Sequence, residues 1–477
     1  MKKRRLMLCG LVSIIMAFVM AVPMVASAAT EIKAGDAASL NAAITNAGEG
    51  DTIKLTAPIS ASITIPADKN ITLDLNGQTL TGGANDAIYV SLGATLTIND
   101  SVGNGSVKAA TGGKAAVFNN GTTTIKNGYY TRSAGQWYTI VNHGTMTIEN
   151  AKADASIDGT SSLIENGYSN YAKKDERAGY VAGTNAKNPE LTINDGTFVS
   201  SGYNAVKNDD GGILNINGGS FTASRENGAV IQNWHHATIT AGEFTAKGES
   251  GTISIGAYNT GVNDGVTTIS GGTFSAEKNA VFAAGVGGNA KGKLTVENGI
   301  FSGKMSSELM NSAYDTTFSG GEFTDDPAQY VADGKVAIKF ARANKDGNYY
   351  VGTQEEIQEI ANTAKDGDTI DVIKGSITLN MTTPGVNVNN DRSNEKGEVI
   401  VNGTPLNPGY GMEIQKPATD PTKPSQDQTQ KPSDTAKADK SAKTGDDFNL
   451  FAVGGVALAA IIVMAAVAVT GRRHRQR

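Results

Sequence analysis

A short segment recurs many times along the chain, and this repetition limits the possible folds more than any other feature. The segment LTINDGTF at 191–198 returns as LNINGGSF at 214–221, 23 residues later. Related segments begin at Thr123, Ala237, Thr267, Leu294 and Thr316. A recurring unit of this size is typical of solenoids, in which each repeat packs only against its neighbours.

Each repeat has the pattern of short strands and contains no helical pattern. Apolar and polar residues alternate in 191–194, which indicates a half-buried strand, and the glycine-containing pair that follows permits a tight turn. A further strand is expected in AAVFNNG at 115–121 and in its counterparts. Short strands without crossover helices can pair with their equivalents in the next repeat. The sequence therefore predicts an all-β fold, a parallel β-helix over residues 30–352 with about ten or eleven coils.

Apolar residues at one phase of the repeat predict the interior of the solenoid. Ile193, Ile216 and Ile239 should stack in one column. Phenylalanines at another fixed phase should form an interior aromatic stack, namely Phe198, Phe221, Phe244, Phe274, Phe301 and Phe323. Asparagines at a third phase should form a hydrogen-bonded ladder, namely Asn119, Asn142, Asn166, Asn208 and Asn233.

One interval is longer than the others. From Ile148 to Ile193 the chain runs 45 residues, about twice the usual spacing. We therefore expect two coils in this interval, with SSLIENG from Ser161 supplying a strand of the first.

The N-terminal part of the repeat region has the pattern of a capping helix. Leu40, Ala43, Ile44 and Ala47 lie at helical spacing, Asp36 can cap the helix and Gly48 can end it. Together with GDTI at 50–53 and ITLDLNGQTL at 71–80, this stretch resembles the start of right-handed parallel β-helices of the pectin-lyase-like superfamily. The resemblance covers residues 34–350. It implies a right-handed solenoid, and the superfamily includes polysaccharide lyases and polygalacturonases.

The opening pattern returns after the repeats. Residues 325–352 look like a closing segment of such solenoids, and residues 353–379 then repeat the order of helix, GDTI and strand, with Asp368 at the place of Asp51. We expect a second, short module of helix plus strands at 353–414.

The two ends predict export and anchoring. Residues 1–29 have a basic start, an apolar run and a small-residue end, the pattern of a signal peptide, and contain the sole cysteine, Cys9. Residues 415–443, rich in Pro, Ser, Thr and Lys, predict an extended linker. Residues 448–470 form an apolar run long enough to span a membrane, followed by a basic tail. We expect an extracellular ectodomain anchored at the cell surface.

The segment 444–477, with SAKTGD just at its start, resembles a cell-wall sorting signal of Gram-positive bacteria. Ser441 and Ala442 stand where that signal has Leu-Pro. The resemblance implies cleavage by a sortase between Thr444 and Gly445 and attachment to peptidoglycan. The alternative is an ordinary transmembrane anchor.

Charge excludes some partners. The whole chain has a net charge of −6. Without residues 1–29, which hold four basic residues, 37 basic and 47 acidic residues remain, a net charge of −10. Nucleic acids and anionic lipid surfaces require a basic face, so we expect neither as a partner.

Unusual residues recur in the turns just after the asparagine ladder. Stacking of equivalent turns would align aromatic and ionisable side chains along one edge, and an insertion at 167–183 leaves from the same edge. Loops on rigid solenoids often carry binding sites. The residues that we expect to form a ligand-binding strip are His143, Tyr168, Tyr171, Asp209, Asp210, Trp234, His235, His236 and Tyr258.

Catalysis by the same strip is an alternative. Asp209 and Asp210 lie one coil from His235, a spacing compatible with acid/base cleavage of a glycoside. The polygalacturonase runs Asn-Thr-Asp, Gly-His-Gly and Arg-Ile-Lys are not present, and of that pattern only the paired Asp is found. No motif for a cofactor or a metal is found, so we expect neither.

The sequence thus favours a non-catalytic surface protein for adhesion or display that binds a polysaccharide or another cell-surface ligand. Two alternatives remain open: a surface-anchored polysaccharide lyase or glycoside hydrolase, and a passive wall stalk without a ligand.

Overall fold

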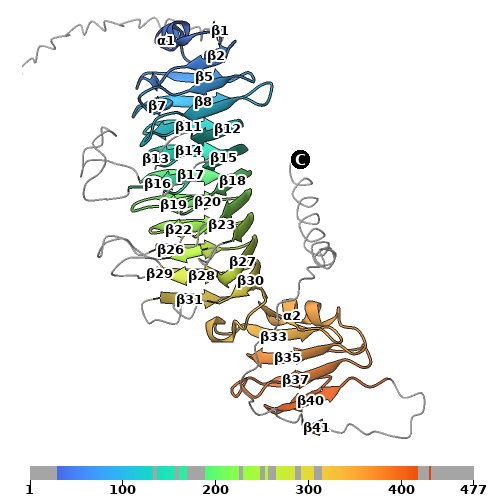
Figure 1. Ribbon diagram of the computed structural model, residues 1–477. Helices are drawn as coiled ribbons and strands as arrows, with labels where there is room; N and C mark the ends of the chain where they lie inside the picture. The colour runs from blue at the N-terminus through green and yellow to red at the C-terminus, as the bar shows by residue number, and fades with distance from the viewer. Residues whose placement is uncertain are drawn as a thin grey trace, which may run out of the picture. The chain divides into compact units, whose positions relative to one another are not determined.

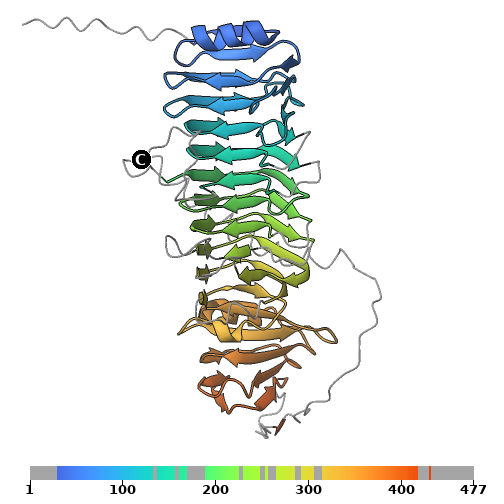
Figure 2. The same cartoon turned by 60° about the vertical axis from the view of Figure 1, so that its left-hand side comes forward.

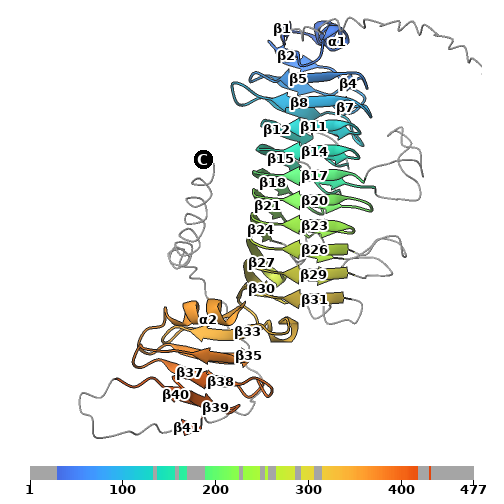
Figure 3. The same cartoon turned by 180° about the vertical axis from the view of Figure 1, so that it is seen from behind.

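The computed structural model describes residues 29–132, 137–155, 161–168, 188–224, 229–247, 253–255, 265–284, 292–305, 314–416 and 429–430. Most of these residues form a right-handed parallel β-solenoid built from three sheets, shown from three sides in Figures 1, 2 and 3. We call these sheets A, B and C. The predicted all-β solenoid is confirmed, but it has about 13 turns, more than the ten or eleven coils predicted.

Sheet A contains 12 parallel strands in the described part of the chain. In order they are β1 (Glu31–Ala34), β2 (Thr52–Leu55), β5 (Asn70–Asp74), β8 (Thr95–Asn99), β11 (Thr122–Ile125), β14 (Thr145–Ile148), β17 (Glu190–Ile193), β20 (Ile213–Ile216), β23 (His236–Ile239), β26 (Gly265–Ile269), β29 (Gly292–Val296) and β31 (Tyr314–Phe318).

Sheet B follows sheet A around each coil, after a tight turn. Its parallel strands are β3 (Ile59–Ser60), β6 (Thr79–Thr81), β9 (Ser106–Ala109), β12 (Tyr129–Arg132), β15 (Ala151–Ala155), β18 (Gly196–Ser200), β21 (Ser220–Ala223), β24 (Glu243–Ala246), β27 (Thr273–Ala280), β30 (Ile300–Lys304) and β32 (Gly321–Phe323).

Sheet C closes each coil and has nine described strands, each of three residues. They are β4 (Ile63–Ile65), β7 (Ile88–Val90), β10 (Val117–Asn119), β13 (Ile140–Asn142), β16 (Ile164–Asn166), β19 (Val206–Asn208), β22 (Ile231–Asn233), β25 (Ile253–Ile255) and β28 (Phe282–Ala284).

The long interval between Ile148 and Ile193 holds one coil, so the prediction of two coils is wrong. β14 pairs directly with β17, with Ile148 opposite Ile193, and β15 pairs directly with β18. The predicted strand of SSLIENG exists as β16 and lies in sheet C between β13 and β19. The extra residues therefore lengthen one connection, from β16 to β17, without adding strands to sheets A and B.

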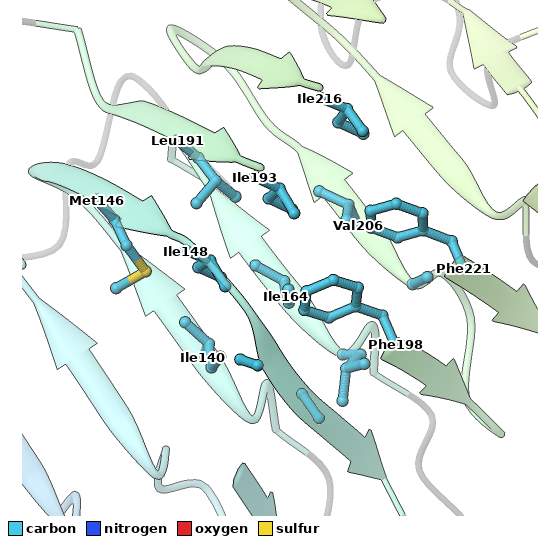
Figure 4. Close-up of a cluster of buried hydrophobic side chains, with 14 of the residues drawn as sticks. Ile140, Met146, Ile148, Ile164, Leu191, Ile193, Phe198, Val206, Ile216 and Phe221 are labelled. Atoms are coloured by element: carbon cyan, nitrogen blue, oxygen red, sulfur yellow. The ribbon is translucent and has the colours of Figure 1, made fainter. Parts of the chain in front are cut away.

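The interior is made of residue columns, as predicted. Ile193 lies opposite Ile216, and Ile216 lies opposite Ile239, in one fully buried column. Figure 4 shows part of this column beside Phe198 and Phe221. Along the six predicted phenylalanines, successive ring centroids lie 4.6–5.0 Å apart with the rings nearly parallel. Stacked rings of this kind add to the free energy of apolar burial.

The turns between sheets A and B require glycine next to this stack. Gly242 has φ +126°, and a Cβ atom added there would lie 3.0 Å from the Phe244 ring. A side chain at this position would therefore be strained and would also press on the aromatic stack.

The asparagine ladder is confirmed and is completely buried. The first four side-chain amides each donate to the next Asn side chain along the solenoid, at 2.7–2.8 Å, and Asn233 donates to the Thr267 hydroxyl at 2.9 Å. Each also donates to a backbone carbonyl of the following coil, for example Asn166 Nδ2 to Ile213 O at 3.0 Å. The ladder thereby satisfies carbonyl groups at the turns that leave sheet C.

The predicted capping helix is α1 (Ala37–Asn46), which begins at the N-cap Asp36 with a reciprocal capping box to Ser39. Leu40, Ala43 and Ile44 are buried in the main core. Helix α1 therefore covers apolar residues at the N-terminal end of the solenoid.

The parallel arrangement ends after β32, which pairs with an antiparallel strand. A 3₁₀ turn, η4 (Ala328–Tyr330), is followed by β33 (Val336–Ala341), β34 (Asn348–Gly352), α2 (Gln354–Ala361), β35 (Thr369–Lys374), β36 (Ile377–Leu379), β37 (Asn387–Asn390), β38 (Val399–Val401), β39 (Thr404–Leu406), β40 (Tyr410–Glu413) and β41 (Thr429–Gln430). β34 is antiparallel to both β32 and β33, whereas β35–β37 and β36–β38 are parallel pairs. These elements enclose a second hydrophobic cluster that runs from Val336 to Ile414.

The two GDTI segments act alike. Asp51 accepts hydrogen bonds from the backbone amides of Gly48 and Thr30, and Asp368 accepts them from Lys365 and Ala343. Each carboxylate joins the turn before its strand to a preceding segment. The hydrogen bonds lower the pKa of Asp51, with the Thr30 amide contributing most.

Within the described ranges, no helix is both long enough and apolar enough to cross a membrane. The predicted signal segment, apart from its last residue, the sorting residues Thr444 and Gly445, and the apolar segment 448–470 lie outside the described residues.

Candidate functional site

The outer face of sheet C differs from the outer face of sheet A. In the three-residue strands of sheet C the first and third residues point inward, so the middle residue points outward. In register, the middle residues form the column Tyr89, Phe118, Val141, Glu165, Lys207 and Gln232. The corresponding column on sheet A is a row of threonines, Thr72, Thr97, Thr124, Thr147 and Thr192. Sheet C thus presents aromatic and ionisable side chains where sheet A presents small polar ones.

Residues of the neighbouring turns pack over this column. The ring centroid of His143 lies 5.0 Å from that of Phe118 and 4.9 Å from that of Tyr168. Trp137 and Tyr138, which precede β13, are half-buried and form an edge-to-face pair with centroids 5.3 Å apart. We call the assembly the sheet C cluster: Tyr89, Phe118, Trp137, Tyr138, His143, Glu165, Tyr168, Lys207, Asp209, Asp210 and Trp234.

The structure buries most of the predicted strip. His143, Tyr168, Asp209, Asp210 and Trp234 are all less than a tenth exposed. His235 is half-buried and His236 is exposed, while Tyr171 and Tyr258 lie outside the described residues. An exposed strip is therefore present in the described residues only at the two histidines; the other predicted members lie beneath the surface of the cluster.

Charged groups meet at the centre of the cluster. Lys207 Nζ lies 2.9 Å from Asp209 Oδ2 and 4.4 Å from the centre of the Trp234 ring. Glu165 lies directly opposite Lys207 on the neighbouring strand, and its Oε2 lies 3.9 Å from His143 Nε2. Within the described residues, no group of three or more His, Cys, Asp or Glu side chains is arranged to hold a metal ion.

Burial changes the protonation of these groups. Loss of water raises the pKa of the Asp209 carboxyl, although the neighbouring Lys207 charge opposes this change. Burial, with the charge of Asp209, raises the pKa of Asp210 to about 6. Burial also raises the pKa of the Tyr138 hydroxyl, helped by the charges of Glu165 and Asp209. Burial thus shifts Asp209 and Asp210 toward their neutral forms.

The raised pKa of Asp210 predicts a pH-dependent stability. Between pH about 4, near the usual aspartate pKa, and pH about 6, the folded state holds this proton more tightly than the unfolded state. The contribution of Asp210 to the free energy of unfolding is therefore largest below pH about 4. It falls as the pH rises to about 6. Denaturation measured from pH 4 to 7 should show this loss, and Asp210→Asn should reduce it. Asp315→Asn, at an exposed site, should leave the pH dependence unchanged; equal curves for Asp210→Asn and the parent would contradict the assignment.

The three residues predicted as a catalytic alternative do not act as a group in the described contacts. Asp209 pairs with Lys207, whereas His235 Nδ1 lies 3.1 Å from Gly212 O. His235 also stacks on His236, with ring centroids 4.2 Å apart. Burial lowers the pKa of His235, and the neighbouring His236 adds to this effect. A neutral imidazole therefore lies beside the acidic cluster.

The sequence analysis missed six residues of the cluster, namely Tyr89, Phe118, Trp137, Tyr138, Glu165 and Lys207. A signal for the last two was present, because each precedes an asparagine of the ladder, in IEN and VKN. Since the ladder asparagine points inward, the residue before it must point outward on a strand.

No family model, no curated protein and no solved structure matches this chain.

Proposed function

We propose that this chain is a cell-surface protein for adhesion or display, and that it binds carbohydrate through the outer face of sheet C. One observation carries the proposal: aromatic rings, carboxyl groups and imidazoles are concentrated on this face around β10–β22. The two half-buried rings of Trp137 and Tyr138 offer an apolar surface for a sugar ring, with polar atoms beside it.

The charge of the cluster favours certain sugars. Lys207 pairs with Asp209, so Glu165 and Asp210 supply the excess of carboxyl groups in the cluster. These carboxyl groups are less than a tenth exposed, so they act on a ligand through their charge; when ionised they attract amino groups and repel uronates. We therefore propose a neutral polysaccharide or an amino-sugar polymer as the ligand, and expect weak binding of pectic acid.

Sequence features support location at the cell surface. The signal-like segment 1–29, the linker 415–443 and the sorting-like segment 444–477 have the order of an exported, anchored protein. We propose that residues 448–470 contact the membrane, and that sortase joins Thr444 to peptidoglycan. The three parallel sheets and the N-terminal helix agree with a distant relationship to the pectin-lyase-like superfamily, which we propose on the resemblance alone.

A glycan panel tests the proposal. Purified residues 30–440 are incubated with neutral glucan and mannan, chitosan oligomers, polygalacturonate and mucin, and both retention and product size are measured. We expect retention of neutral or amino sugars without shortening, and at least about tenfold weaker retention after Trp137→Ala with Tyr138→Ala. Tyr349→Ala, at a half-buried tyrosine of β34, is the matched control.

Other outcomes are equally informative. Shortened or unsaturated sugars would replace the proposal with a hydrolase or lyase. Retention of no glycan would contradict carbohydrate binding and favour a passive stalk. Equal losses for the double variant and for Tyr349→Ala would show that the sheet C cluster is not the binding face.

A further inference from the structure

The ion pair of Lys207 and Asp209 has a shorter N–O distance and more deeply buried side chains than an exposed ion pair of this solenoid. The Asp209 side chain has no exposed surface, and the Lys207 side chain is 15% exposed, with N–O distance 2.9 Å. By comparison, the ion pair of Lys293 and Asp315 has side chains that are 53% and 68% exposed, at 3.4 Å. An amine and a carboxyl group are thus held together with little water between them.

The backbone fixes both groups. Lys207 lies in the middle of β19, directly opposite Glu165 of β16. The Asp209 amide donates to Asn166 O at 2.7 Å, and Asp209 O accepts from the Gly212 amide at 3.0 Å. The buried Asn166–Asn208 ladder contact lies in the same turn. The amine and the carboxyl are therefore positioned by sheet, ladder and turn at once, which lowers the entropic cost of a reaction between them.

A third group can transfer protons. Glu165 lies directly opposite Lys207 on the neighbouring strand, and the Trp234 ring covers the amine at 4.4 Å. In such an apolar setting, transfer of a proton from the ammonium to a carboxylate removes two opposite charges, and a neutral pair is favoured. The raised pKa of Asp209 agrees with a neutral carboxylic acid at this position.

We propose that Lys207 and Asp209 condense to an intramolecular amide, with Glu165 as the acid and base. The neutral amine attacks Asp209 Cγ, and the new C–N bond forms. Glu165 takes a proton from the nitrogen and returns it to the departing hydroxyl, so the C–O bond breaks and one water leaves. No oxidant or other reactant is required. The amide closes the turn after β19, and this inference does not depend on carbohydrate binding.

Mass spectrometry of the full chain purified from cells tests the proposal. We expect the native chain to lack the mass of one water molecule. Trypsin should fail to cut after Lys207, since the enzyme needs a free amine there, and should release residues 188–225 as one dehydrated peptide. The exposed pair of Lys293 and Asp315 is the internal control, and trypsin should cut after Lys293.

Two variants test whether the Lys207 amine and the Glu165 carboxyl take part in amide formation. Lys207→Arg keeps the positive charge but has no amine, and Glu165→Gln keeps the shape but removes the proton-transferring group. Both should have the full mass, and trypsin should cut after residue 207. Circular dichroism shows that each variant is folded, so that loss of the amide is distinguished from loss of the fold.

Some results would overturn the proposal. These are a full-mass native chain that trypsin cuts after Lys207, or a dehydrated Glu165→Gln variant. A succinimide at Asp195–Gly196 or Asp210–Gly211 has the same mass as the amide, but it hydrolyses in mild base and leaves Lys207 open to trypsin. Dehydration that disappears in mild base would therefore also refute the amide.

Discussion

Phe244→Ala is expected to lower the free energy of unfolding by about 3–5 kcal/mol. Phe244 is 1% exposed, and its ring lies between those of Phe221 and Phe274, at 5.0 and 4.6 Å. Truncation removes buried apolar surface, leaves a cavity and interrupts the aromatic stack. Each coil is held only by its neighbours, so the loss should appear as earlier unfolding of the middle coils.

Urea denaturation followed by circular dichroism measures this loss. Thr245→Ala is the matched control, because Thr245 follows Phe244 on β24 and is only half-buried. We expect it to change stability by less than about 0.5 kcal/mol. Similar values for the two variants would contradict a continuous aromatic core.

Asn166→Ala is expected to lower the free energy of unfolding by about 2–6 kcal/mol, because two acceptors in the ladder lose their donor at about 1–3 kcal/mol each. Asn166 Nδ2 donates to Asn208 Oδ1 at 2.7 Å and to Ile213 O at 3.0 Å. Asn142 Nδ2 also loses Asn166 Oδ1, its acceptor at 2.7 Å. Removal of one side chain therefore interrupts the ladder on both sides.

Asn194→Ala provides the control, since Asn194 accepts a similar amide hydrogen bond, from Asn217 at 2.9 Å, at an exposed site. Water replaces that bond, so little stability should be lost. Hydrogen exchange of the amides of β16, β19 and β22 measures the difference. Equal exchange in the two variants would show that the buried ladder adds nothing beyond a surface hydrogen bond.

The fold could be predicted from the sequence because every coil repeats the same pattern of apolar, asparagine and glycine positions. The position of a residue within the repeat was enough to predict two interior columns: the isoleucines Ile193, Ile216 and Ile239, and the phenylalanine stack. The number of coils between Ile148 and Ile193 did not, because an inserted loop and an extra coil lengthen the interval equally. Only strand pairing separates these cases.

The candidate site could be predicted from the sequence only in part. Strands of three residues are too short to show alternation, so the outward positions of Glu165 and Lys207 had to be inferred from the ladder. Turn residues such as Asp209 were expected at the surface because turns usually are. Their burial arises from packing of His143, Tyr168 and Trp234 over sheet C, which depends on three-dimensional neighbours from different coils.

The most direct test of carbohydrate binding on sheet C is hydroxyl-radical footprinting with and without a retained glycan. We predict that oxidation of Trp137, Tyr138 and His236 falls when the glycan is present. Oxidation of Tyr349 and Tyr410, in strands β34 and β40, should stay constant. Unchanged oxidation of Trp137 and Tyr138 in the presence of a bound glycan would contradict the account.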